Sequence, residues 1–130
     1  MIGLLTLATT LLVAAAPTSL AVSAPVSDAQ ELVSGHMEVV VVEAPGCGYC
    51  QLFRSRVLPA YEASPQTRDV PVRFINASGL DAGGVKLSGP VDVIPTAIFV
   101  RDGIELGRIS GYVGRENFFR SINHLMAKAR

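Results

Sequence analysis

Four consecutive valines, Val39 to Val42, stand in the segment MEVVVVE at residues 37–43. Valine is β-branched and favours an extended backbone, and side chains along a strand point alternately to the two faces of a sheet. All four valines are buried only if both faces of the sheet are covered. The run therefore predicts a central strand in a layered α/β fold, ending at the sequence APG of residues 44–46.

The rest of the chain alternates between helical and extended patterns. Phe53, Val57 and Tyr61 recur at four-residue spacing, which predicts a helix, and Pro59 is expected to kink it. In chain order we expect a short helix at 27–33, a strand at 37–43, a helix at 50–61, a strand at 70–75, a glycine-rich surface excursion at 76–92 with room for one short helix, a hairpin of strands at 96–100 and 105–109, and a helix at 115–129. This order predicts a mixed central β-sheet flanked by helices on both faces.

The first 27 residues carry no charge, and all 11 basic and 11 acidic residues lie between Asp28 and Arg130. An apolar run at 2–16 is followed by small residues, which is typical of a secretory signal peptide. We therefore expect residues 1–24 to be a leader that directs the protein to the periplasm.

Small residues precede two possible cleavage sites, after Ala21 and after Ala24, and the first is favoured because Pro25 is a poor first residue. The remaining chain, residues 25–130, has the length of one domain. No Lys or Arg precedes the apolar run, so an uncleaved membrane anchor and a misassigned start codon stay open as alternatives.

Charge and histidine content limit other classes of function. The net charge is zero, the pI is about 6.7, and no basic patch is interleaved with aromatic residues, so nucleic-acid binding is not expected. Two cysteines are too few for a disulfide-rich miniprotein, so the domain needs an ordinary core. His36 and His124 have no partner at ligand spacing and are expected at the surface or in packing, and Met37 and Met126 are expected in the core.

The two cysteines, Cys47 and Cys50, lie between the buried strand and the helix. Unpaired N–H groups at a helix start favour a thiolate at Cys47, and Cys50, one helical turn later, is placed to attack a mixed disulfide formed there. A structural disulfide is disfavoured because closing so short a loop contributes only about 2 kcal/mol. A copper or zinc site is the other alternative, although structural zinc needs four ligands. The pattern therefore favours redox chemistry.

A proline opens the strand at 96–100, in the sequence Ile94, Pro95, Thr96. Proline is tolerated at the first residue of a strand, where no ladder N–H is required. A cis bond between Ile94 and Pro95 would turn the backbone toward the thiols, and an ordinary strand-edge proline is the alternative.

Together these residues resemble the thioredoxin superfamily over residues 36–128. The resemblance rests on the valine strand, the cysteine motif at a helix start, Ile94-Pro95-Thr96, the Asp102-Gly103 hairpin, and Gly111 before the last helix. It implies the thioredoxin-like fold, with Cys47 as the attacking thiol, Cys50 as the resolving thiol and Pro95 in the cis form. It also implies a substrate groove lined by Tyr49, Ile94, Pro95 and Gly111.

Two positions depart from the thioredoxin pattern. Thioredoxins carry Trp before the first cysteine and a buried Asp beneath the pair, where this chain has Gly46 and Val41. Glu43 has the same strand parity as Val41 and is expected on the same face. The Gly48-Tyr49 dipeptide is similar to that of periplasmic disulfide isomerases, but their dimerisation domain does not fit in a chain of this length.

The motif Pro45-Gly46-Cys47-x-Tyr49-Cys50 in a short exported chain resembles the thioredoxins of bacterial sulfur-oxidation (Sox) systems. That resemblance implies a protein that keeps a partner's cysteine reduced. We therefore expect an exported, monomeric thiol–disulfide oxidoreductase that needs no cofactor. It would reduce a disulfide or persulfide of a cysteine-containing exported partner and receive electrons from a membrane thiol carrier. A membrane-tethered form, and a copper or zinc carrier without turnover, are the alternatives, and the direction of electron flow depends on the reduction potential.

Overall fold

The computed structural model describes residues 35–130, so the predicted leader at 1–24 and the predicted helix at 27–33 lie outside the described residues. The elements are β1 Met37–Glu43, α2 Gly48–Leu52, the π-helical segment η1 Phe53–Val57, α3 Leu58–Glu62, the 3-10 helix η2 Pro65–Thr67, β2 Val72–Asn76, the 3-10 helix η3 Ala77–Gly83, β3 Thr96–Arg101, β4 Ile104–Ser110 and α4 Arg115–Lys128. Over this described range, no helix has the length and apolar character needed to cross a membrane.

The four strands form one mixed sheet in the order β2-β1-β3-β4. β1 runs parallel to β2, with Val39 opposite Val72, and antiparallel to β3, with Val42 opposite Thr96. β3 and β4 form the expected antiparallel hairpin. β1 is hydrogen-bonded along both edges, which confirms the central strand that the valine run predicts.

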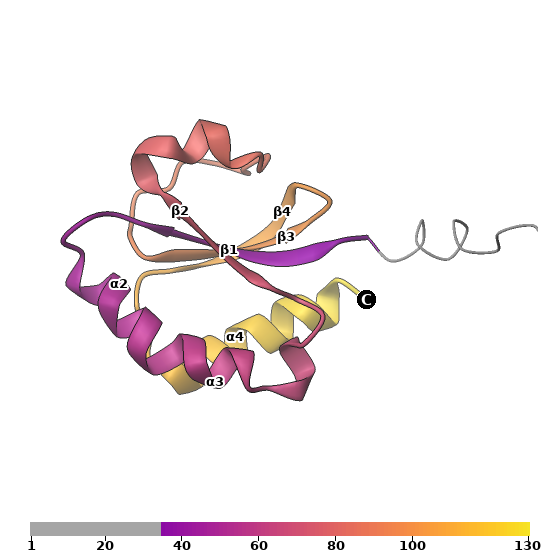
Figure 1. Ribbon diagram of the computed structural model, residues 1–130. Helices are drawn as coiled ribbons and strands as arrows, with labels where there is room; N and C mark the ends of the chain where they lie inside the picture. Colours follow the sequence, from indigo (N-terminus) through magenta and orange to yellow (C-terminus); the bar gives the residue numbers. More distant parts are fainter. Residues whose placement is uncertain (1–34) are drawn as a thin grey trace, which may run out of the picture.

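Both faces of β1 are covered, and Figure 1 shows that the two covers differ. Val39 and Val41 pack with side chains of η1, α3 and α4, which lie beneath the sheet in this view. Val40 and Val42 pack against the segment at 77–94, which lies above it and contains the short helix η3. All four valines are at most 1% exposed, as a sheet covered on both faces requires.

The segment at 76–92 is more than the surface excursion that its glycines predict. Its apolar side chains, together with those of neighbouring residues, form the second core by packing on Val40, Val42, Ile98 and Val100; they are Ile75, Ala77, Leu80, Val85, Leu87, Val91 and Ile94. The N–H of Lys86 donates to the carbonyl of Gly103 at 2.7 Å, and the N–H of Glu105 donates to the carbonyl of Lys86 at 3.1 Å. Backbone hydrogen bonds therefore join the segment to the hairpin.

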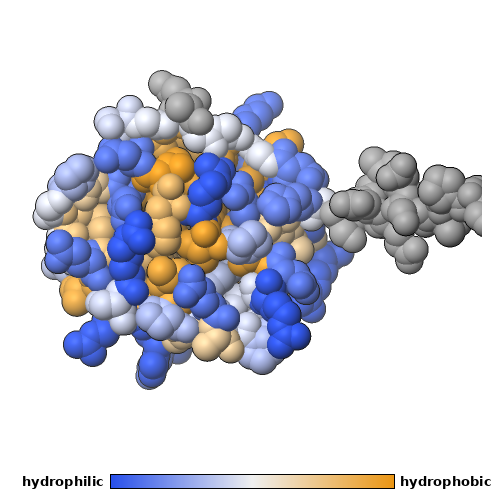
Figure 2. Space-filling view, in the orientation of Figure 1, coloured by the Kyte–Doolittle hydropathy of each residue, from blue (hydrophilic) through white to orange (hydrophobic). Residues whose placement is uncertain are grey.

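β2 is an edge strand, and its residues Val72 to Ile75 are only partly buried. Figure 2, in the orientation of Figure 1, shows apolar side chains gathered in the middle of the face where β2 passes, with hydrophilic side chains around them. The charged side chain of this strand is paired: Arg73 donates to Glu38 of β1 through two nitrogens, at 3.0 and 2.9 Å. That hydrogen-bonded guanidinium lowers the pKa of Glu38 below its ordinary value.

The helix after β1 begins at Gly48, two residues earlier than predicted, because Cys47 is its N-cap. Within η1, the N–H of Leu58 donates to the carbonyl of Phe53, five residues back, which is the π-helical pattern. Pro59 follows and has no N–H to offer to the next α-helical bond. The kink predicted at Pro59 therefore takes the form of a π-helical turn just before it.

The main core is built on aromatic side chains. Phe118 of α4 lies edge-on to Phe53 and Tyr61, with ring centroids 5.2 and 6.1 Å apart. The hydroxyl of buried Tyr61 donates to the carbonyl of Val70 at 2.8 Å, so its polar end is satisfied. These contacts tie the cysteine-bearing helix to α4 and to the start of β2.

The methionines and histidines are placed as the sequence predicts. Met126 is buried in the main core, and Met37 packs against that core from the start of β1. His36 and His124 are both exposed.

Candidate active site

The cysteine pair lies just beyond the C-terminal end of β1, where a tight turn leads into α2. The N–H of Cys47 donates to the carbonyl of Ala44 at 3.3 Å, and Gly46 in this turn has a φ of +74°. That left-handed conformation strains any residue with a Cβ atom. The turn therefore favours glycine where thioredoxins carry Trp. Cys47 and Cys50 are joined by a disulfide bond, so the structure represents the oxidised form.

The two sulfurs lie in different surroundings. Cys50 is buried, with 4% of its surface exposed, whereas Cys47 is only partly buried. The N–H of Cys50 donates to the sulfur of Cys47 at 3.1 Å, and the N–H of Gln51 donates to the carbonyl of Cys47. Hydrogen bonds and the dipole at a helix start favour negative charge on an N-cap sulfur. The more accessible sulfur is therefore also the one that accepts a backbone hydrogen bond at the helix start.

Ile94, Pro95 and Gly111 lie at the same edge of the sheet as the cysteines. β3 runs antiparallel to β1, so the start of β3 lies at the end of β1, and Ser110 at the end of β4 pairs with Thr96. The bond between Ile94 and Pro95 is cis. The N–H of Gly111 donates to the carbonyl of Pro95 at 2.8 Å. The topology therefore gathers these predicted site residues, although they are far apart in the sequence.

Tyr49 reaches into solvent from the middle of the cysteine motif, with 64% of its surface exposed. Its ring stacks on that of Tyr112, with centroids 6.3 Å apart and planes 23° from parallel. Sequence reasoning missed Tyr112, although an aromatic residue directly after Gly111, in the loop before the last helix, was the available signal. The aromatic pair connects the cysteine loop to the start of α4.

Glu43 at the end of β1 also lies beside the cysteines. Its side chain is on the same face of the sheet as Val41, as the alternation along the strand predicts. Arg54 donates to both carboxylate oxygens of Glu43, at 2.9 and 2.6 Å, and its guanidinium lies 3.6 Å above the ring of Phe74. The hydrogen bond from Arg54 to Glu43 raises the pKa of the arginine. Glu43, Arg54 and both cysteines line a pocket of about 220 Å³. Sequence reasoning missed Arg54, although it follows Cys50 by one helical turn.

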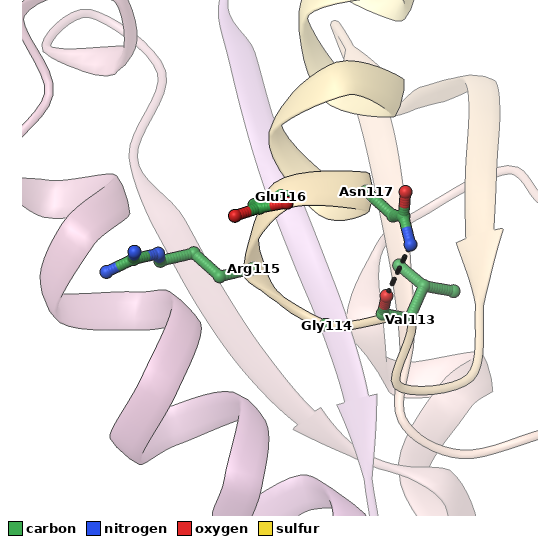
Figure 3. Close-up of a pocket in the computed structure, with 5 residues that line it drawn as sticks. All are labelled: Val113, Gly114, Arg115, Glu116 and Asn117. Carbon is green, nitrogen blue, oxygen red and sulfur yellow. Dashed lines mark hydrogen bonds between the residues drawn. The ribbon is translucent and has the colours of Figure 1, made fainter.

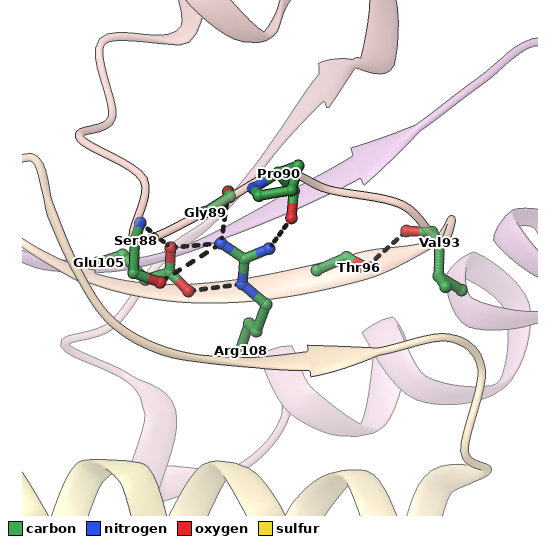
Figure 4. A network of polar contacts seen from close by, with 7 residues as sticks. All are labelled: Ser88, Gly89, Pro90, Val93, Thr96, Glu105 and Arg108. Atoms are coloured by element: carbon green, nitrogen blue, oxygen red, sulfur yellow. Dashed lines mark hydrogen bonds and ion pairs between the residues drawn. The ribbon is translucent and has the colours of Figure 1, made fainter.

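A polar network holds the segment that leads to Pro95 (Figure 4). Arg108 of β4 donates to both oxygens of Glu105, at 2.6 and 2.7 Å, and to the carbonyls of Pro90 at 2.5 Å and Gly89 at 3.0 Å. The N–H of Ser88 donates to Glu105 at 2.8 Å. The bonds from Arg108, helped by those from Ser88 and opposed by burial, lower the pKa of Glu105 from 4.5 to about 2.

The metal-carrier alternative depends on further ligands near the cysteines. Within residues 35–130, apart from the side chains of residues 81 and 82, no group of three or more His, Cys, Asp or Glu side chains is placed to hold a metal ion. The two sulfurs are bonded to each other in this form. Among the described side chains, no third His, Cys, Asp or Glu is therefore placed to complete a metal site with the pair.

The mixed sheet, with the cysteine pair at the start of α2, defines a class of proteins, the thioredoxin-like redox domains. The chain belongs to that family, since the model of the thioredoxin-like domain matches residues 32–125. The match covers β1 to most of α4 and includes both cysteines, Pro95 and Gly111.

Among solved structures, the chain is similar to the reduced form of the periplasmic thioredoxin SoxS from Paracoccus pantotrophus. The two are 28% identical, with a TM-score of 0.68 over 72% of this chain and 99% of that one. Two further thioredoxins share the fold. Thioredoxin-2 of the malaria parasite is 14% identical, with a TM-score of 0.52 over 70% of this chain and 84% of that one. Poplar thioredoxin h is 22% identical, with a TM-score of 0.52 over 71% of this chain and 78% of that one. Comparison with curated proteins gives no match.

Proposed function

We propose that this protein is a periplasmic thiol–disulfide oxidoreductase that works as a reductant. The observation that carries the proposal is the asymmetry of the cysteine pair: Cys47 is accessible and hydrogen-bonded by a helix N–H, and Cys50 is buried directly beside it. A nucleophile must reach its substrate, and a resolving thiol must reach only the nucleophile. The pair meets both requirements.

The reaction begins with the reduced pair. The thiolate of Cys47 attacks one sulfur of a substrate disulfide, the substrate S–S bond breaks, and the departing sulfur takes a proton from solvent. Cys50 then loses its proton and attacks the sulfur of Cys47, which releases the second substrate thiol and leaves the disulfide seen here. Two electrons pass to the substrate. With a persulfide, the same two electrons release hydrogen sulfide and a free thiol.

The positions of Ile94, Pro95, Gly111 and Tyr49 around the cysteines support their assignment as a substrate groove. The similarity to a periplasmic thioredoxin supports a cysteine-containing exported partner, and the name of that neighbour supports a place in sulfur oxidation. A periplasmic reductant must itself be reduced again, so we assign a membrane thiol carrier as the electron donor.

The test uses the reduced protein, freed of reductant, with insulin as the disulfide substrate. We expect the wild type to transfer two electrons per molecule, Cys47→Ser to transfer none, and Cys50→Ser to remain as a mixed disulfide that mass spectrometry detects. The chain has no Trp, so the reduction potential is read by thiol alkylation and mass shift. A potential near −270 mV, about that of thioredoxin, agrees with a reductant, whereas one near about −120 mV would show a disulfide donor instead.

A further inference from the structure

A pocket of about 380 Å³ lies beside the tyrosine pair, between the cysteine-bearing helix and the start of α4. Leu52 and Arg56 line it from the helix, and Tyr112 and Arg115 line it from the other side. Tyr112 also stacks on Tyr49, which stands between the two cysteines in the sequence, so the pocket adjoins the redox site. A polypeptide segment of a substrate that reaches Cys47 can therefore also occupy this pocket.

The pocket combines an apolar floor with two cations. Leu52 is 38% exposed although it is a large apolar residue, and Tyr112 is partly buried. Arg56 and Arg115 are exposed, and neither forms an ion pair or a side-chain hydrogen bond within the described part of the chain. Arg54, on the same helix, differs because Glu43 occupies its guanidinium. The guanidinium groups of Arg56 and Arg115 are thus free to bind an anion.

A carboxylate close to Arg115 in the sequence belongs to Glu116. Figure 3 shows Arg115 extending from the first turn of α4 toward the cysteine-bearing helix, whereas Glu116 ends closer to its own helix and Val113 and Asn117 lie on the other side. Glu116 lines the neighbouring hollow, which Val113, Asn117 and Arg115 also line, but no ion pair joins Glu116 to Arg115. It therefore leaves the guanidinium of Arg115 available.

We propose that this pocket selects protein substrates whose reactive cysteine is flanked by an apolar residue and by Asp or Glu. This inference rests on the proposed function and specifies its substrate class. A carboxylate accepts hydrogen bonds from guanidinium groups, and the apolar neighbour covers Leu52 and Tyr112. Complementary charge also accelerates encounter, and this effect weakens with salt. The partner is thus an acidic, partly apolar polypeptide segment.

The experiment measures how fast the reduced wild-type protein is oxidised by two synthetic peptides in single-turnover reactions. Each peptide carries one cysteine as a mixed disulfide with the neutral chromophore 2-thiopyridine, flanked by Leu and Glu in one peptide and by Leu and Lys in the other. Two exposed ion pairs predict that the acidic peptide reacts about five to ten times faster at low salt. The preference is expected to disappear in Arg56→Gln/Arg115→Gln.

The matched control is Arg68→Gln/Arg130→Gln, which removes the same charge at the far end of the molecule. Arg68 precedes β2 and Arg130 follows α4, so both lie away from the edge that carries the cysteines. The control must keep the wild-type preference. A small neutral disulfide, 2-hydroxyethyl disulfide, must oxidise all three proteins at equal rates, which shows that thiol reactivity and folding are intact.

Two results would overturn the inference alone: equal rates with the acidic and basic peptides, or a preference that survives in Arg56→Gln/Arg115→Gln. Failure of the wild type to react with both peptides and with 2-hydroxyethyl disulfide would overturn the proposed function, and the inference with it. The neutral disulfide therefore separates the two failures.

Discussion

Replacing Arg108 by Met should destabilise the protein by about 3 kcal/mol at pH 7. The side chain of Glu105 is only 2% exposed, and Arg108 is the main reason that its pKa is about 2 and not 4.5. Because one pKa unit is equivalent to about 1.4 kcal/mol, the folded state stabilises the ionised carboxylate by about 3 kcal/mol. Without the guanidinium, Glu105 keeps its charge in a buried position with only Ser88 as a partner.

The pH dependence gives a sharper test of the same pair. A carboxylate with a lowered pKa contributes stability above pH 4.5 that is lost as the pH falls toward 2. The difference between wild type and Arg108→Met should therefore shrink over this interval. Urea unfolding followed by far-ultraviolet circular dichroism measures it, and Glu105→Gln, which keeps the bonds from Arg108 to Gly89 and Pro90, is the control. A difference below about 0.5 kcal/mol, or one that does not change with pH, would refute the reasoning.

Four further substitutions test the packing and the backbone. Gly111→Ala should cost about 1–2 kcal/mol because its φ is +79°, whereas Gly48→Ala, at a helix start with open space around it, should cost under about 0.5 kcal/mol; equal melting temperatures would contradict this. Phe118→Ala should lower the free energy of unfolding by about 3–5 kcal/mol because it empties the aromatic core, and a loss under about 1 kcal/mol in urea would show that the core refills the space. Tyr61→Phe should cost about 1–2 kcal/mol because the buried carbonyl of Val70 loses its donor, and unchanged calorimetric stability would contradict that hydrogen bond.

The sequence predicts the main sheet and the main helices well because periodic apolar patterns carry them. The valine run, the hairpin and the last helix are within one or two residues of their predicted bounds, because each is specified by neighbours in the chain. The cover formed by 77–94 was harder to predict, since its apolar side chains are separated by glycines and follow no helical or strand period.

The same distinction holds at the site. The cysteines and Pro95 follow from local motifs, whereas the contacts between Tyr49 and Tyr112 and between Glu43 and Arg54 depend on side chains that only the folded chain brings together. Single-sequence patterns show which residues share one face of one element. They do not show which loop meets that face, so the two arginines of the adjoining pocket could not be grouped in advance.

The pairing of β1 with β3 also bears on how the protein matures. Val42 pairs with Thr96, 54 positions later, and Met37 pairs with Arg101, 64 positions later. The edge that carries Cys47 and Pro95 therefore assembles only after a long-range closure, which is a slow kind of folding step. The cysteines are three positions apart and can be oxidised before that closure. With two cysteines there is a single intramolecular connectivity, so early oxidation creates no wrong isomer that must be reshuffled.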